Sequence, residues 1–368
     1  DIQYMLTHSN YNKVSQSMGM MSHLLFIIIC SYRSEMIALF HILFLTLSLT
    51  HCQIFHLPSS TELNKLWHDF KRSFNKTYVG YHEERRRQAW EENLQRIVEH
   101  NKDAHKGKHS YFININDLSD LNTRTYLQKM VKLTQSTRRK LENPEVVGDF
   151  YEMAHHIPDE FDWRKAGFKT PIYNQKDCGS CYAFSVALAL QAQIFKQTNQ
   201  LVPLSAQQLV DCSVSAGNYG CGGGSLRNTL RYLDQSGGLM TYKDYPYIAK
   251  QTRCHFDQHR AIVNLSSWAI LPARNERAME IAIYKIGPIA ASINASPHTF
   301  QLYHSGVYDD PFCSPNTVNH AMLVVGYTKD AWILKNWWGN RWGEDGYMRL
   351  RRGANRCGIA NFVAYGVV

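Results

Sequence analysis

The sequence around one cysteine of this chain is suited to a nucleophilic thiol. Cys181 follows Gly179-Ser180 in the segment 175–184, and it begins an apolar run that extends to Phe195. An apolar run of this length predicts a helix, and the positive end of a helix dipole favours a thiolate over a thiol. The thiolate is the form that attacks carbonyl carbons. Most cysteines in apolar surroundings are nevertheless structural, so this position alone does not establish a nucleophile.

Three further side chains supply what acyl transfer by a cysteine requires: a base, a group that orients it, and donors for an oxyanion. His320 precedes an apolar stretch, and Asn336 stands beside two tryptophans, where an amide is costly to bury without hydrogen bonds. We expect the Asn336 oxygen to hold an imidazole N–H while an indole shields that bond from water. Gln175 can present its side-chain NH₂ beside the Cys181 backbone N–H as an oxyanion hole.

Composition argues against several other classes of protein. The chain has 368 residues, enough for two or three domains, and its apolar content of 44% is ordinary. The net charge of +9 is spread along the chain without a basic and aromatic cluster, so we expect no nucleic-acid binding. The Cys-x₂-Cys pair 178/181 suggests a metal-binding alternative, but no second pair has zinc spacing. We therefore expect neither a metal nor a cofactor.

The N-terminal segment predicts entry into the secretory pathway. Residues 37–50 are apolar and follow Met36, and their length suits a signal peptide within a leader at 1–52. We interpret residues 1–35 as an over-extension of the coding sequence, and a single membrane anchor over 24–50 is the alternative. Asn-x-Ser/Thr sequons mark three glycosylation candidates, which are Asn75, Asn264 and Asn294.

The number of cysteines agrees with one free thiol. Nine cysteines occur, and Cys30 and Cys52 lie in or beside the leader, which leaves seven. An odd number in an oxidising compartment predicts three disulfides and one unpaired cysteine. The count leaves the connectivity open, although the helix-start position favours Cys181 as the free thiol.

Two blocks follow the leader. Residues 60–132 are charged and repeat apolar residues at helical spacing, which predicts two amphipathic helices. Residues 133–154 lack this periodicity and predict an exposed linker that is open to proteolysis. In residues 155–368 helical patterns precede strand-like ones, so two lobes of different class are expected, with the chemistry at their junction. The helical positions are Trp67, Phe70, Phe74 and Tyr78, then Trp90, Leu94, Ile97 and Asn101; the predicted strands are 288–294, 321–327, 331–336, 347–351 and 361–368.

The ordered motifs resemble those of papain-type cysteine protease precursors, nearest the cathepsin L group. Residues 178–182, Cys-Gly-Ser-Cys-Tyr, match the family's nucleophile motif, and His320 and Asn336 follow at about the family's 130–150-residue spacing. Further matches are residues 204–212, the glycines after Cys221, and 357–360. The resemblance extends from about residue 63 to the C-terminus.

This resemblance implies an α+β, papain-like fold with a helical left lobe and a β-barrel-like right lobe, preceded by a helical propeptide. It implies a cysteine endopeptidase in which Cys181 attacks, His320 moves the proton, Asn336 orients His320, and Gln175 completes the oxyanion hole. A thiolate–imidazolium pair is expected in the resting enzyme. The family's disulfide pattern implies the pairs Cys178–Cys221, Cys212–Cys254 and Cys313–Cys357.

The first block resembles the family's inhibitory propeptide. Its two motifs correspond to residues 82–101 and 114–120, with His82 in place of the usual first acid. The resemblance implies that this segment packs on the β lobe and runs backwards through the cleft. Asp120 and its neighbours are expected to lose charge in acid and loosen the block, and cleavage is expected between about residues 150 and 159.

The resemblance also implies a specificity pocket for the second residue before the scissile bond. We expect no acidic residue in it and a preference for Val over Phe, because Phe362 stands where a small residue is common. Gly224 is expected to bond the substrate backbone. The expected pocket and cleft residues are Ser225, Leu226, Ser292, Val318, Phe362 and Trp338.

Two residues depart from the family pattern near the nucleophile and the orienting amide. Tyr182 replaces a tryptophan and Trp337 replaces a serine, and neither change removes a catalytic group. We therefore expect an active, monomeric, lysosomal or extracellular protease. Its expected partners are peptide and protein substrates, its own propeptide and cystatin-type inhibitors. A catalytically silent relative kept for binding or storage is the alternative.

Overall fold

The computed structural model describes residues 59–134 and 156–368. The predicted signal peptide and most of the predicted linker lie outside these residues. The described chain divides after Gly80 into two compact units, and this division falls inside the block 60–132 that the sequence predicted as one propeptide. Within the two described ranges, no helix combines the length and the apolar content that crossing a bilayer requires.

The first unit contains helix α4 (Ser60–Ser73). Ser59 caps it, because its hydroxyl accepts the Glu62 N–H while the Glu62 carboxylate accepts the Ser59 N–H at 2.8 Å. Trp67 stacks on Tyr78 with ring centroids 6.2 Å apart. Tyr78 nevertheless lies beyond the helix on which the periodicity placed it, because Asn75 takes a φ of +50° and the chain leaves the helical path.

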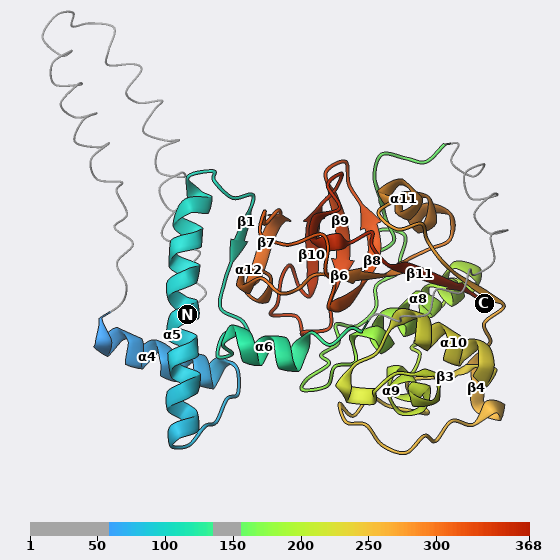
Figure 1. Cartoon of the computed structure of the whole chain (residues 1–368), viewed down its shortest axis with the longest axis horizontal. Helices are drawn as coiled ribbons and strands as arrows, with labels where there is room; N and C mark the ends of the chain where they lie inside the picture. Colours follow the sequence, from blue (N-terminus) through green and yellow to red (C-terminus); the bar gives the residue numbers. More distant parts are fainter. Residues whose placement is uncertain (1–58, 135–155) are drawn as a thin grey trace, which may run out of the picture. The chain divides into compact units, whose positions relative to one another are not determined.

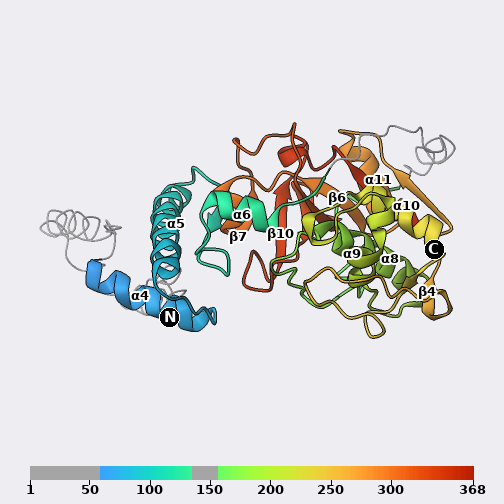
Figure 2. The ribbon, with the colours of Figure 1, turned by 60° about the horizontal axis from the view of Figure 1, so that its bottom comes forward.

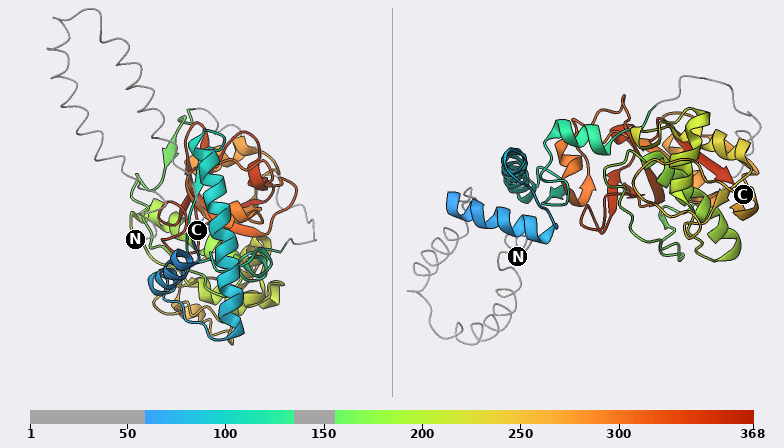
Figure 3. Two further views of the ribbon diagram at one scale, coloured as in Figure 1. Left: turned by 90° about the vertical axis from the view of Figure 1, so that its left-hand side faces the viewer. Right: turned by 90° about the horizontal axis from the view of Figure 1, so that it is seen from below.

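The second unit begins with the remaining propeptide elements and continues into a helical lobe. Figures 1 and 2 show α6 between the long helix α5 and the helical lobe, and Figure 3 shows α5 in front of the strands of the β lobe. The apolar run after Cys181 forms α8, which is buried over most of its length because it packs against both α10 and the strands β6, β8 and β11. The helices and helical turns are α5 (Tyr81–His105), α6 (Thr123–Met130), α8 (Cys181–Thr198), α9 (Ala206–Cys212), α10 (Leu226–Ser236), α11 (Glu276–Lys285), α12 (His298–Gln301), η1 (Ser213–Ala216), η2 (Gly220–Gly222), η3 (Gln258–Arg260) and η4 (Arg356–Gly358).

The β lobe is one sheet with the strand order β1-β7-β10-β9-β8-β6-β11-β5, and β2 pairs with β8. All five predicted strands are present as β6, β8, β9, β10 and β11. Strand β7 was not predicted, because its interior residues His-Ser-Gly-Val are polar or small and half-exposed. The strands are β1 (Tyr111–Ile113), β2 (Phe161–Asp162), β3 (Leu239–Met240), β4 (Ala261–Val263), β5 (Ser267–Ile270), β6 (Ile289–Ile293), β7 (Tyr303–Tyr308), β8 (His320–Tyr327), β9 (Ala331–Lys335), β10 (Tyr347–Arg351) and β11 (Val363–Val367).

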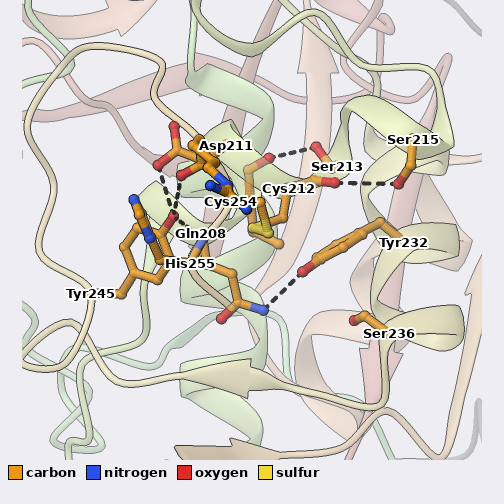
Figure 4. Close-up of a disulfide and its surroundings, with 12 residues drawn as sticks. Gln208, Asp211, Cys212, Ser213, Ser215, Tyr232, Ser236, Tyr245, Cys254 and His255 are labelled. Carbon is orange, nitrogen blue, oxygen red and sulfur yellow. Dashed lines mark hydrogen bonds between the residues drawn. A yellow bond between two sulfur atoms is a disulfide. The ribbon is translucent and has the colours of Figure 1, made fainter. Parts of the chain in front are cut away.

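Three disulfides are present, and they are the pairs that the resemblance implied: Cys178–Cys221, Cys212–Cys254 and Cys313–Cys357. Cys181 is a free, buried thiol. Figure 4 shows the second disulfide, beside which the Tyr245 hydroxyl donates to Asp211 at 2.9 Å and accepts the His255 N–H at 3.1 Å. The disulfide and these bonds tie the loop before η3 to α9.

The three glycosylation candidates differ in exposure. Asn75 and Asn264 are exposed. Asn294 is buried, with 3% of its surface accessible, and its amide donates to the Ser314 carbonyl at 3.1 Å. A glycan on that nitrogen would need space that the fold fills, so Asn294 is a wrong prediction.

Candidate active site

Helix α8 and strands β8 and β9 bring the predicted residues together. Cys181 is the first residue of α8, His320 is the first residue of β8, and Asn336 directly follows β9. Strands β8 and β9 are antiparallel neighbours, which places the residue that opens one strand near the residue that follows the other. All three side chains are buried, as is Gln175 in the loop before α8.

The Asn336 side chain fixes the orientation of the imidazole. Its Oδ1 lies 2.9 Å from Nε2 of His320 and also accepts the Trp337 backbone N–H at 2.9 Å. The second bond identifies the amide atom as the oxygen, so Nε2 carries the proton that His320 donates. Nδ1 of His320 has no hydrogen-bond partner among the described residues. The ring of Trp338 lies 4.8 Å from the imidazole and shields the bond from water, as the sequence predicted.

Burial holds both candidate catalytic groups neutral while the propeptide is in place. It raises the pKa of the Cys181 thiol to about 12, although the backbone N–H groups of Ala321, Tyr182 and Lys132 act in the opposite direction. It lowers the pKa of His320 to about 4, although the hydrogen bond that Nε2 donates to Asn336 acts in the opposite direction. Since the Ala321 N–H reaches the sulfur from the residue beside His320, the thiol lies at the junction of α8 and β8. The predicted ion pair therefore requires a cleft that water can enter.

The segment after α6 covers this junction. Gln175 Nε2, the predicted oxyanion donor, donates to the Met130 carbonyl of the propeptide at 3.2 Å as well as to the Cys178 carbonyl at 2.9 Å. The Leu133 N–H donates to the Asn319 carbonyl and the Thr134 N–H to the Gly224 carbonyl, both at 2.9 Å. These two bonds reach opposite lobes, so the propeptide backbone spans the cleft.

One glycine leaves the space that the propeptide backbone needs to cross the cleft. Gly223 has a φ of +116°, and a Cβ built on it would lie 2.1 Å from the Lys132 carbonyl oxygen. Any side chain here would collide with the propeptide backbone and strain its own. Leu133 also forms a parallel bridge with Gly224, so the propeptide backbone takes the place at Gly224 that was predicted for the substrate.

The two predicted propeptide motifs bind each other. On α5, the Asn93 amide donates to the carbonyls of Ser119 at 2.8 Å and Leu121 at 3.0 Å. Arg86 lies 3.7 Å from the buried Asp120 carboxylate and also donates to the Asp120 carbonyl at 3.4 Å. The first motif therefore holds the second as a rigid segment.

That segment is bound in turn to the β lobe. Strand β1 pairs antiparallel with β7 and so extends the sheet. The Gln301 amide donates to the carbonyls of Leu118 and Leu121 at 2.8 Å, and the Tyr126 hydroxyl donates to the Ala295 carbonyl at 2.6 Å. Arg341 contacts Asp117 through two nitrogens at 2.8 and 3.1 Å, and Lys129 pairs with Asp177.

A cavity of about 390 Å³ lies beside the cleft and is lined by all five residues predicted for the specificity pocket. Leu133 and Thr134 of the propeptide also line it, and no aspartate or glutamate does. Sequence reasoning missed four lining residues because they lie in loops and outside any motif. They are Ala273, Arg274, Asn316 and Asn361.

The Cys-x₂-Cys pair does not offer two thiolates to a metal, because Cys178 is bonded to Cys221. Among residues 59–134 and 156–368, no cluster of three or more His, Cys, Asp or Glu side chains has the geometry to hold a metal ion.

Comparison with known proteins decides the family. Residues 157–367 match the model described as "Papain family cysteine protease", and residues 67–126 match "Cathepsin propeptide inhibitor domain (I29)". The chain belongs to the papain family. This protease is 39% identical over 317 residues to Cathepsin K of Mus musculus, and the aligned residues cover 84% of this chain and 95% of that protein. Cathepsin S of Bos taurus is 38% identical over 317 residues, 84% of this chain and 94% of that protein.

Solved structures agree with the family. Digestive procathepsin L2 from the larval midgut of Tenebrio molitor aligns with a TM-score of 0.77 at 31% identity, covering 83% of this chain and all of that one. Digestive procathepsin L 3 of the same source aligns with a TM-score of 0.73 at 31% identity, covering 84% and 100%. The predicted family, two-lobe α+β fold and cysteine endopeptidase class are confirmed, and the papain-family protease carries an inhibitory propeptide domain.

The two departures from the family pattern are accommodated in the core of the papain-family protease. Tyr182 is buried, and its hydroxyl donates to the Gly220 carbonyl at 3.1 Å. Trp337 is buried, stacks on Phe184 at 5.4 Å, and donates from its indole to the Ala321 carbonyl at 2.9 Å. Both added polar groups are satisfied, and neither occupies the position of a candidate catalytic atom.

Proposed function

We propose that this protease hydrolyses peptide bonds with Cys181 as nucleophile and His320 as its proton partner. The observation that carries the proposal is the imidazole geometry. Asn336 holds Nε2 at 2.9 Å, and Nδ1 has no partner among the described residues. His320 begins β8, the strand on which the helix that starts at the free thiol Cys181 packs. An imidazole fixed at one nitrogen and free at the other can take the thiol proton and return it.

The proposed steps follow from these positions. With substrate in place of the propeptide, the Cys181 proton moves to Nδ1 of His320 and the sulfur attacks the carbonyl carbon. The oxyanion accepts hydrogen bonds from Gln175 Nε2 and from the Cys181 backbone N–H at the start of α8. His320 then protonates the leaving amine, and a thioester remains on the sulfur. Water that gives a proton to His320 hydrolyses this thioester and releases the acid product.

Acid release of the propeptide is part of the proposal. Two ion pairs, Arg341–Asp117 and Lys129–Asp177, join the propeptide to the peptidase block through carboxylates. The buried Asp120 contacts Arg86 within the propeptide. Protonation of such carboxylates removes their attraction to the cations and weakens docking.

The proposed organisation keeps the predicted boundaries. We place the leader at 1–52, the inhibitory propeptide at 60–132, the cleaved linker at 133–154 and the peptidase at 155–368. Three disulfides support folding in an oxidising compartment, and we propose a lysosomal or extracellular destination. We also propose that the protease is a monomer and that cystatin-type inhibitors bind it.

The specificity proposal concerns valine and phenylalanine. Phe362 lines the cavity, and its ring reduces the length available to a second aromatic side chain. We expect the activated protease to cleave peptides with Val in the second position before the scissile bond faster than those with Phe. Matched fluorogenic peptides measure this, and a clear advantage for Phe contradicts it.

Covalent labelling tests the catalytic proposal. We expect an epoxide thiol reagent to label the acid-activated chain at Cys181, and the peptide that carries the label identifies the residue by mass spectrometry. The matched Cys181→Ala chain should stay unlabelled, and the untreated precursor should react more than about a hundredfold slower because its thiol is neutral and covered. A folded, propeptide-free chain that resists labelling would overturn the proposal.

A further inference from the structure

The specificity cavity is lined by both apolar and polar side chains. Leu226, Val318 and Phe362 supply the apolar side chains. Arg274, Asn316 and Ser292 line the same cavity with donors and acceptors. A side chain that fills this cavity must therefore match both apolar surface and hydrogen-bonding groups.

Arg274 is held at the cavity by its backbone and its side chain. Its N–H donates to the Ala360 carbonyl at 2.7 Å, and its guanidinium donates to Asn316 Oδ1 at 2.9 Å. It takes a φ of +61°, a conformation that costs free energy in a residue other than glycine. No carboxylate pairs with it among the described residues, so its charge and its remaining N–H donors are available to a ligand.

Ser292 provides a second, independent donor. It is fully buried on β6, and its hydroxyl has no hydrogen-bond partner within the described parts of the chain. A buried hydroxyl without a partner costs free energy that an incoming acceptor would recover. Ser225 lines the cavity too, but its hydroxyl already accepts the Asn228 N–H at 3.1 Å.

A second arginine contacts one of the lining residues. The guanidinium carbon of Arg227 lies 5.5 Å from the centroid of the Phe362 ring. Among the described residues that line the cavity, Arg274 is the only charged one, so the charge at the lining is positive.

We propose that this pocket accepts an acidic side chain, glutamate in particular, in the second residue before the scissile bond. The two methylenes of glutamate pack on Leu226, Val318 and Phe362. The carboxylate accepts hydrogen bonds from Arg274 and from the Ser292 hydroxyl. Valine fills only the apolar part, so both residues fit, and a lysine is excluded by its charge. The proposal rests on the catalytic function proposed above and names its substrate class.

The test uses the acid-activated full chain and peptides that differ only at this position. Active protease is first counted by epoxide labelling, and kcat/KM is then measured for Val, Glu, Gln and Lys at low salt near pH 6. We expect Glu to exceed Gln by about fivefold, since a charge-assisted bond to a partly exposed arginine is modest in strength. Lys should be the slowest of the four. The ratio of Glu to Gln should fall as pH drops from 6 to 4, because the substrate carboxyl titrates near 4.3.

Substitutions at Arg274 and Ser292 test whether these residues cause the preference for Glu over Gln. Arg274→Asn keeps a residue that tolerates positive φ, and it should bring the Glu-to-Gln ratio to about one at every pH. Ser292→Ala should slow the Glu and Gln peptides more than the Val peptide, because only the first two present an acceptor to this hydroxyl. Arg277→Gln is the matched control, because it removes a nearby arginine that pairs with Glu280 and does not line the cavity. The Glu-to-Gln ratio of kcat/KM for this variant should equal that of the unsubstituted chain.

The outcomes separate the two proposals. Labelling and cleavage of the Val peptide without any Glu advantage, or with an advantage that Arg274→Asn leaves intact, overturns the inference alone. A Lys peptide that is cleaved faster than the Glu peptide does the same. Absence of both labelling and Val cleavage overturns the catalytic proposal, and the inference with it.

Discussion

At the scale of single residues, one oxygen atom organises the candidate catalytic site. Oδ1 of Asn336 accepts both the imidazole N–H and the backbone N–H of Trp337, so neither the amide nor the ring can turn without breaking a buried bond. Trp337 adds a further constraint, because its indole donates to the carbonyl of Ala321, the residue after His320. A tryptophan in a position where serine is usual therefore serves to position the histidine.

Gln175 gives a prediction at this scale. It donates to the Met130 carbonyl in the precursor and is placed to donate to the oxyanion in the active protease. We expect Gln175→Ala to lower kcat by about 10²–10³-fold with little change in KM, the usual effect of removing one oxyanion donor. Steady-state kinetics on the activated, thiol-titrated chain measure the change.

The control for this variant is Gln197→Ala, an exposed residue of α8 whose amide donates to the Val368 carbonyl. It should leave kcat unaltered. A Gln175→Ala chain with undiminished kcat would remove Gln175 from the proposed mechanism.

At the scale of elements, the propeptide inhibits by adding secondary structure to the peptidase block. Strand β1 extends the sheet at β7, and the segment after α6 bonds both lobes across the cleft. Since backbone groups make these contacts, they fix the path of the chain with little dependence on its side chains. The helix α5 contributes indirectly, because Asn93 and Arg86 hold the segment that precedes α6.

We expect a histidine on α5 to make docking of the propeptide depend on pH. His100 bonds the Tyr111 carbonyl at 3.1 Å and stacks on His109 at 4.3 Å, and His298 and Asp310 of the β lobe also face it. Burial lowers the pKa of His100 to about 4, against an ordinary value of 6.5. The released propeptide therefore binds more protons than the docked one between these values. The contribution of neutral His100 to the stability of the docked propeptide is complete above pH 6.5 and decreases as the pH drops towards 4.

We therefore expect His100→Gln to lower the pH at which half of the precursor is activated, by about half a unit. Activation over a pH series, followed by gel and by peptide hydrolysis, measures this midpoint. His68→Gln changes an exposed histidine of α4 and serves as control. An unchanged midpoint in His100→Gln would show that carboxylates alone set the pH of release.

At the scale of the whole molecule, the precursor with its propeptide in place keeps its candidate reactive groups in an unreactive state. The thiol and imidazole are buried and neutral, the oxyanion donor is occupied, and the specificity cavity is partly lined by the propeptide. We expect one event, departure of the propeptide from Met130 onwards, to expose the thiol and imidazole, free Gln175 of its propeptide acceptor and open the cavity. Activation is therefore expected to be a single transition without a partly active precursor.

Acid treatment of the purified precursor tests this expectation. Mass spectrometry should find a new N-terminus between about residues 150 and 159, and activity should rise in step with the cleaved fraction. The Cys181→Ala precursor should not process itself, but the active protease added in trace amount should cleave it at the same place. Activity that precedes any cleavage would contradict the single-transition account.

The sequence determined the chemistry and much of the scaffold. The motif around Cys181, the order of His320 and Asn336, the odd cysteine count and five strands could be read directly, because each depends on residue type and short spacing. These features predict which groups react, and they identify segments that form the core around those groups.

Only the tertiary structure decided what surrounds those groups. Arg274 and Asn316 reach the specificity cavity from loops with no recognisable pattern, and Asn294 carries a sequon yet is buried by packing between distant segments. Strand β7, with a weak pattern of its own, is stabilised by partners on both sides. Burial, protonation and pocket charge arise from contacts between residues far apart in the chain. Such contacts depend on many positions of the sequence together, so no single position reveals them.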